Sequence, residues 1–170
     1  MTEYQTIYQF NNANNETKMV GPNHQYWQLM EDFFKTEVLI RHSEVKISAN
    51  HPSSSLIKLY LETAETILDN KVSLSEIDLL SIMRNLTLEN RDEIIALFLK
   101  KQILIITSTG KAVFPRTFTQ KRFLECLPQN DIIFAVGPAG TGKTYLSVLY
   151  AVSMLKSNQV KKIILVRPVV

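Results

Sequence analysis

The sequence predicts an α/β protein in which a small α+β module precedes an incomplete parallel sheet. Three observations carry this prediction. The first part of the chain shows elements in the order β-α-β-β-α, which is typical of small α+β modules. An apolar strand, a glycine-rich loop and a helix then follow one another within residues 131–156. A second apolar strand, at residues 162–167, completes one β-α-β unit with parallel strands.

The elements of the N-terminal module follow from the spacing of apolar residues. Residues 5–10 alternate as a strand does, and the Asn-rich residues 11–15 are typical of a loop. A helix is expected to start at Pro22, because apolar residues recur after it in steps of three and four. Two hairpin strands and a second amphipathic helix are expected at residues 37–42, 45–49 and 53–69.

A connector is expected between this module and the glycine-rich part of the chain. Ser75 and Asp78 resemble a capping box and predict the start of a helix. Residues 103–106 predict a short strand with a turn at Gly110 after it, and Thr119 is expected to cap a further helix. The expected domains are the module at residues 1–72, the connector at 73–113 and the incomplete domain at 114–170.

Residues 137–144 fit the pattern G-x-x-x-x-G-K-[ST] of phosphate-binding loops. Glycines allow several backbone N–H groups to point inward together, and the following helix adds the positive end of its dipole. Lys143 is suited to bridging β- and γ-phosphate oxygens, and the Thr144 hydroxyl is suited to Mg²⁺. A glycine-rich turn without a ligand is the alternative, which the flanking strand and helix disfavour. The residues expected to contact a nucleotide are Gly137, Pro138, Ala139, Gly140, Thr141, Gly142, Lys143, Thr144 and Tyr145.

Charge is distributed unevenly along the chain. Residues 1–99 carry a net charge of −6 and residues 100–170 one of +9, which gives +3 for the whole chain. A basic C-terminal part suits a polyanionic ligand such as a nucleotide or RNA, so RNA is a candidate partner. Complementary charge between two packed parts of the chain explains the same distribution equally well.

Composition narrows the class of protein and its compartment. A content of 45% hydrophobic and 21% charged residues is typical of a folded globular chain. Cys126 is the single cysteine, so a reducing, cytoplasmic location is expected. No apolar run is long enough to span a membrane, and the N-terminus lacks the features of a signal peptide. An exposed strand edge at residues 162–167 favours pairing between copies, so a homo-oligomer is a candidate assembly.

Several C-terminal motifs occur together in this sequence. They are Phe114-Pro115-Arg116-Thr117, then Gln120, then residues 130–146 with the glycine-rich loop, then Ile163-Ile164-Leu165-Val166-Arg167-Pro168-Val169. Together they resemble the PhoH family, cytoplasmic bacterial P-loop ATPases related to the N-terminal core of superfamily I helicases. The N-terminal module resembles the family's small KH-like module in element order. The resemblance implies an α/β fold: an incomplete P-loop NTPase core preceded by a KH-like βαββα module.

The resemblance also implies roles for individual residues. Residues 137–144 would bind the phosphates of ATP together with Mg²⁺, the two expected cofactors. Gln120 stands where helicase-like proteins often place a glutamine that reads adenine; a solvated helix residue is the alternative. Arg167, at the end of the second strand, is expected either to contact a phosphate or nucleic acid or to cap the strand.

Two departures from the family pattern bear on function. Family members continue into a Glu-Ala-Gly-Glu-like segment and an acidic strand, which this sequence lacks, so a truncated chain that binds ATP with little turnover is expected. The N-terminal module has no Gly-x-x-Gly loop of the kind that clamps a nucleic-acid backbone. A non-catalytic RNA- or protein-binding module with a vestigial nucleotide loop is the alternative function. A small kinase-like enzyme is disfavoured, because nothing after Thr144 offers a lid or an acceptor site.

Overall fold

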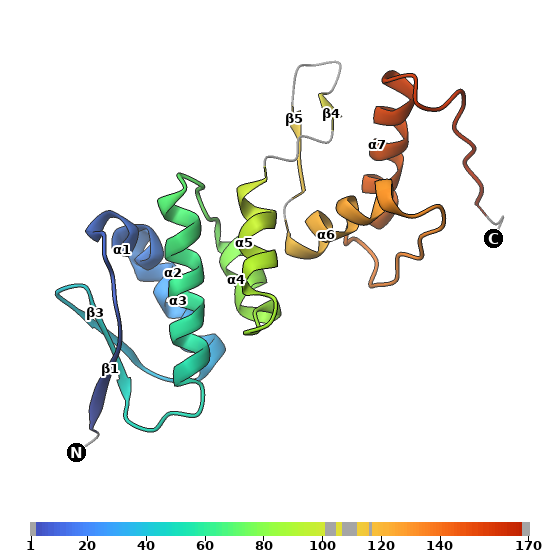
Figure 1. Cartoon of the computed structure of the whole chain (residues 1–170). Coiled ribbons are helices and arrows are strands. Elements are labelled where there is room, and N and C mark those ends of the chain that lie inside the picture. Colours follow the sequence, from blue (N-terminus) through green and yellow to red (C-terminus); the bar gives the residue numbers. More distant parts are fainter. Residues whose placement is uncertain (1–2, 101–104, 107–111, 116, 168–170) are drawn as a thin grey trace. The chain divides into compact units, whose positions relative to one another are not determined.

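The computed structural model describes residues 3–100, 105–106, 112–115 and 117–167 (Figure 1). The chain divides into two compact units, residues 1–100 and residues 101–170. The finer expected division, into residues 1–72, 73–113 and 114–170, remains a prediction.

The first unit is a mixed α/β structure with its elements in the expected order and one additional helix. Its strands are β1 (Tyr4–Gln9), β2 (Val38–Arg41) and β3 (Glu44–Ser48). Its helices are α1 (Ala13–Val20), the short 3₁₀ helix η1 (Pro22–His24), α2 (Gln25–Phe34), α3 (Ser54–Asp69), α4 (Glu76–Asn85) and α5 (Arg91–Leu99).

The three strands form one antiparallel sheet in the order β1-β3-β2. Val38 lies opposite Ile47 in the β2–β3 pair, and Arg41 lies opposite Glu44 beside the turn. His42 and Ser43 form that turn with φ values of 52° and 64°. Positive φ at both central residues matches the right-handed twist of the flanking strands. The predicted hairpin is therefore confirmed.

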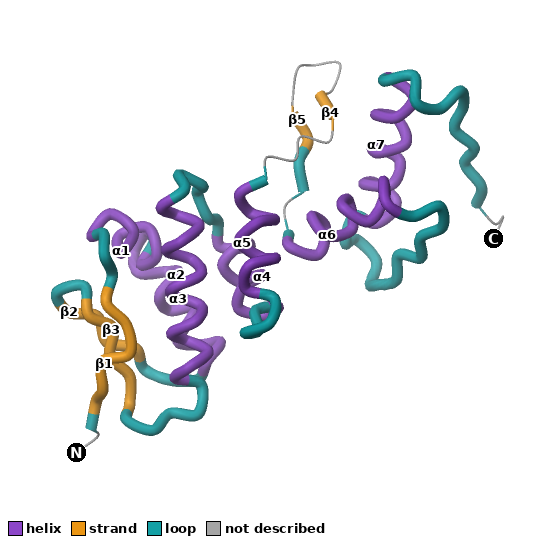
Figure 2. The backbone as a smooth tube through the Cα atoms, in the orientation of Figure 1, coloured by secondary structure: helices purple, strands orange, loops and turns teal. Residues whose placement is uncertain are grey.

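Helix α3 lies along the sheet and is the centre of the first unit (Figure 2). It contacts β1, α1, α4 and α5, so α4 and α5 belong to the same packed body. The capping box predicted at Ser75 and Asp78 is confirmed as the start of α4. The core consists of apolar side chains that are at most 1% exposed, among them Val45, Ile47, Ile57, Leu61, Ile67, Leu79, Ile82, Ile94 and Leu97.

Helix α1 corrects the expectation of a loop at residues 11–15. The side chain of Asn12 accepts a hydrogen bond from Asn14 N at 2.9 Å and caps a helix that begins at Ala13. Asn15, which is 2% exposed, donates through Nδ2 to Asp69 Oδ1 at 2.6 Å. Asn favours both turns and helix N-caps, so an Asn-rich stretch can begin a helix once tertiary contacts support it.

A buried carboxylate joins β1 and the start of α1 to α3. Glu65 is 2% exposed and accepts hydrogen bonds from the Tyr8 hydroxyl and from Asn11 N, the latter at 3.1 Å. Asn11 Nδ2 lies at 3.5 Å from Glu65 Oε2. Burial raises the pKa of the Tyr8 hydroxyl above its usual value, and the hydrogen bond to Glu65 raises it further. The carboxylate is therefore well supplied with donors, as a buried charge requires.

The second unit contains two short strands and two main helices in its described part. The strands β4 (Ile105–Ile106) and β5 (Ala112–Val113) pair antiparallel. Helix α6 spans Phe118–Cys126, the 3₁₀ helix η2 spans Leu127–Gln129 and α7 spans Lys143–Lys156. Residues 103–104 of the expected strand and the turn at Gly110 lie outside the described residues. The structure places the cap of α6 at Thr117 and not at Thr119, because the Thr117 hydroxyl accepts from Gln120 N at 3.2 Å.

The strands expected at residues 131–136 and 162–167 are not formed. In the described part of the chain neither segment pairs with another strand. Phe134 is 89% exposed and Val136 is 95% exposed, while Val166 is 88% exposed. A strand is stable only when partners satisfy its backbone groups, and two parallel segments alone gain little from pairing. The prediction of a buried pair of parallel strands is therefore wrong for this structure.

Helix α7 packs against α6 with a single fully buried residue, Leu146, which is 3% exposed. No helix within the described residues combines the length and the apolar character needed to cross a bilayer.

Candidate phosphate-binding site

The glycine-rich loop lies directly before the N-terminus of α7. Gly140 and Gly142 have φ values of 79° and 89°, which residues with a side chain rarely adopt. A Cβ at Gly140 would meet no atom within 4 Å, so backbone angle and not space requires glycine there. A Cβ at Gly142 would in addition lie 3.2 Å from Gln120 Nε2. These two glycines allow the chain to turn sharply into the helix.

The ammonium group of Lys143 lies over the loop that precedes it. Its Nζ donates to the carbonyl oxygen of Gly137 at 2.7 Å and to that of Pro138 at 2.5 Å. It also lies 3.3 Å from the hydroxyl oxygen of Thr141, which itself donates to the Pro138 carbonyl at 3.1 Å. The loop therefore wraps around a cation, and an anion entering the loop would compete with these oxygens for it.

The first turn of α7 supplies further donors beside this cation. Gly142 is the N-cap residue and has no side chain with which to satisfy the first N–H groups of the helix. Thr144 and Tyr145 lie in that first turn and are exposed. Backbone N–H groups at the positive end of a helix and one ammonium group are suited to bind the oxygens of a polyphosphate. The hydroxyl oxygen of Thr144 is suited to its Mg²⁺.

Gln120 reaches this loop from α6. Its Nε2 donates to the carbonyl oxygen of Thr141 at 3.1 Å. The family resemblance implied that Gln120 reads adenine, with a solvated helix residue as the alternative. In the structure its side-chain amide is hydrogen-bonded to the backbone of the loop. Sequence reasoning did not predict that Thr117 would anchor Gln120, since the cap was expected two positions later. The Thr-x-x-Gln spacing at the start of a helix, which a capping box also shows, was the available signal.

Arg167 and Asp131 lie on the two segments that flank the loop and its helix. Both residues are exposed. The strand that Arg167 was expected to end is not formed, so its expected role as a strand cap has no support in this structure. A contact of Arg167 with a phosphate or with nucleic acid stays a prediction.

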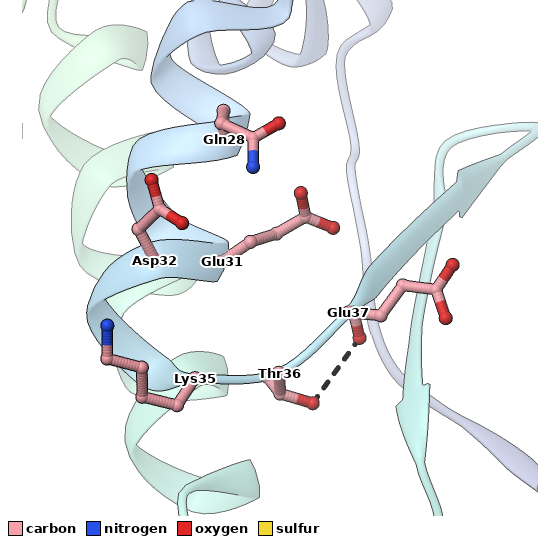
Figure 3. A pocket seen from close by; sticks show the side chains of 6 residues that line it. All are labelled: Gln28, Glu31, Asp32, Lys35, Thr36 and Glu37. Atoms are coloured by element: carbon pink, nitrogen blue, oxygen red, sulfur yellow. Dashed lines mark hydrogen bonds between the residues drawn. The ribbon is translucent and has the colours of Figure 1, made fainter.

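A separate hollow of about 380 Å³ lies at the C-terminal end of α2 (Figure 3). Two of its carboxylates hold the local backbone and strand β1: Glu31 accepts from Val38 N at 2.8 Å, and Glu37 accepts from the Tyr4 hydroxyl at 2.6 Å. The Glu31 bond fixes the connection between α2 and β2, and the Glu37 bond joins this connection to β1 at the surface, so both carboxylates already have partners within the fold. The lining residues are Gln28, Glu31, Asp32, Lys35, Thr36 and Glu37.

The G-x-x-x-x-G-K-[ST] pattern, placed at the N-terminus of a helix, is characteristic of P-loop proteins. Residues 112–170 match a family model, that of the PhoH-like proteins. The matched residues include the loop, α6 and α7. The family is the one that the sequence motifs had indicated.

Curated relatives agree with this match. A PhoH-like protein of Bacillus subtilis is 28% identical over 159 residues, which cover 94% of this chain and 49% of the relative. One from Mycobacterium leprae is 50% identical over 66 residues, or 39% of this chain and 19% of the relative. One from Synechocystis is 28% identical over 134 residues, or 79% of this chain and 40% of the relative. These matches confirm the resemblance to the PhoH family.

The chain spans about half the length of the Bacillus relative and less of the other two. No solved structure was found to match it.

Proposed function

We propose that this chain binds ATP with Mg²⁺ through residues 137–145, as a P-loop protein of the PhoH-like type. The observation that carries the proposal is the Lys143 ammonium held inside a glycine-rich loop at the N-terminus of α7. The family match supports it, because it includes the whole loop. A cytoplasmic location belongs to the same proposal.

Each part of the loop has a distinct task in this proposal. Gly140 and Gly142 let the backbone turn so that its N–H groups can face an anion. Lys143 exchanges its carbonyl partners for phosphate oxygens, and the exposed Thr144 would offer its hydroxyl oxygen as a ligand to Mg²⁺. When bound, Mg²⁺ neutralises charge on the β- and γ-phosphates. The remaining residues of the set, Gly137, Pro138, Ala139, Thr141 and Tyr145, line the loop and the first turn of α7.

Equilibrium binding of Mg²⁺-ATP, measured by calorimetry on the 170-residue chain, tests the proposal. Lys143→Ala should weaken binding by about tenfold to hundredfold, the range expected for hydrogen bonds to a charged group. Lys161→Ala is the matched control, because Lys161 is an exposed lysine of the same unit and its loss changes the net charge equally. Equal affinities of the Lys143→Ala variant and the unaltered chain would contradict the proposal.

A second candidate function, binding of RNA, is favoured by one observation. The net charge of +9 on residues 100–170 includes the exposed residues Lys156, Lys161, Lys162 and Arg167. If these side chains contact phosphates, RNA affinity without nucleotide should fall steeply between roughly 50 and 200 mM salt. Absence of binding at the lower salt concentration would eliminate this candidate and leave ATP binding untouched.

A further inference from the structure

A side chain of α6 donates a hydrogen bond to the phosphate loop at a residue that lies between two glycines. Gln120 Nε2 donates to the Thr141 carbonyl at 3.1 Å, and Thr141 lies between two glycines with positive φ, Gly140 and Gly142. Glycine on both sides lowers the cost of rotating the intervening peptides. A hydrogen bond at this carbonyl therefore selects one orientation among several that the backbone permits.

The orientation of that carbonyl determines the direction of one N–H group. The Thr141 carbonyl and the Gly142 N–H belong to the same peptide unit, which is planar and trans. Fixing the carbonyl toward Gln120 therefore turns the Gly142 N–H to the opposite side. On its side-chain end, Thr141 contacts Lys143 Nζ through its hydroxyl at 3.3 Å. Thr141 thus contacts α6 through its backbone carbonyl and the Lys143 ammonium group through its side-chain hydroxyl.

Gln120 is itself fixed at its backbone and at its tip. The Thr117 hydroxyl accepts from Gln120 N at 3.2 Å, which places Gln120 in the first turn of α6. Its amide lies close against Gly142, where a Cβ would come within 3.2 Å of Nε2. Because the residue is held at its backbone and at its side-chain amide, the position of α6 determines where the amide meets the loop.

We propose that Gln120 is a positioning residue of the phosphate loop, which fixes the Thr141–Gly142 peptide for binding the polyphosphate part of the nucleotide. This inference rests on the proposed function. It differs from adenine reading in a measurable way. A residue that positions the loop sets the affinity for any polyphosphate, whereas a residue that reads the base sets only the preference for adenine.

The test uses Gln120→Met, which keeps the length and helix propensity of the side chain and removes the amide donor. Gln129→Met is the matched control, because Gln129 is an exposed glutamine a few residues further along, in η2. Dissociation constants of Mg²⁺-ATP, Mg²⁺-GTP and inorganic tripolyphosphate are measured for both variants and the unaltered chain. The ¹⁵N heteronuclear NOE of the Thr141 and Gly142 amides is measured without any ligand, with circular dichroism as the check on folding.

We expect Gln120→Met to weaken all three ligands by the same factor, about twofold to tenfold, as for the loss of one neutral hydrogen bond. The NOE at residues 141–142 should fall in this variant while the helix content is unchanged, and Gln129→Met should change neither quantity. A loss confined to ATP would overturn the proposal and make Gln120 a base reader. If the unaltered chain binds none of the ligands, the proposed function fails. The NOE then decides alone: an unchanged value in Gln120→Met overturns the positioning role, and a lowered value supports it.

Discussion

The buried carboxylate of Glu65 allows a sharp test of what holds the first unit together. Tyr8→Phe removes only the hydroxyl that donates to Glu65. It keeps the ring, which packs edge-on against Phe10 at a centroid distance of 5.3 Å. Because Glu65 is 2% exposed, water has little access to replace the lost donor.

The expected cost follows from the remaining partners of the carboxylate. A hydrogen bond to a charged group contributes about 1.5–3 kcal/mol net. Glu65 keeps the Asn11 N donor at 3.1 Å, and the Tyr8 side chain is half-buried, so the lower part of that range applies. With a urea m-value of about 1.5 kcal/mol/M, the unfolding midpoint of the first unit should fall by about 1 M.

The chain supplies both the probe and the control for this measurement. Trp27 is the single tryptophan and is buried in the first unit, where its Nε1 donates to the Val38 carbonyl at 2.7 Å. Its fluorescence therefore follows the unfolding of this unit. Tyr4→Phe makes the same change on the same strand, but the Tyr4 hydroxyl donates to the exposed Glu37 and its loss should hardly move the midpoint. Equal midpoints for the two variants would refute the reasoning.

Further predictions concern a glycine, the effect of high pH and an exposed ring. Gly21→Ala should lower the free energy of unfolding of the first unit by about 1–3 kcal/mol. The reason is that φ at Gly21 is 73° and an added Cβ would lie 2.5 Å from the Tyr26 ring. An unchanged unfolding midpoint in urea would contradict this. Burial raises the pKa of both Tyr8 and Tyr60, so the unfolded chain loses these protons first and the stability of the first unit should decrease as pH rises above about 10. A urea midpoint that stays constant between about pH 9 and 11 would count against this assignment. The Phe134 ring is 89% exposed, so Phe134→Ser should leave the thermal midpoint unchanged. The loss of an exposed apolar ring should also reduce self-association, measured by sedimentation velocity. A large loss of stability would show that the ring is buried in solution.

The sequence predicted most of the first unit because its signals are local. Apolar spacing identified α2 and α3, the alternation around His42 and Ser43 identified the hairpin, and the Ser75–Asp78 pair identified the start of α4. Helix α1 was missed because Asn favours turns and N-caps alike, and tertiary contacts such as that of Asn15 with Asp69 favour the helix.

The second unit shows where such reasoning fails. Residues 131–136 and 162–167 have the composition of buried strands, but strand formation depends on partners that a segment does not contain. The loop itself was predicted because its spacing is fixed by a local backbone requirement. The contact between Gln120 and Thr141 joins residues 21 positions apart, and only the packing of α6 against α7 brings them together.

The location of Trp27 has a consequence for how communication between the two units can be studied. The proposed ligand site lies wholly in residues 101–170, and the single tryptophan lies wholly in residues 1–100. A change in tryptophan emission on addition of ATP would therefore show that binding in the second unit alters the surroundings of Trp27 in the first, free of any signal from a tryptophan in the binding loop. By reciprocity, if ATP binding changes the free energy of unfolding of the first unit, unfolding of that unit should change the free energy of ATP binding by the same amount.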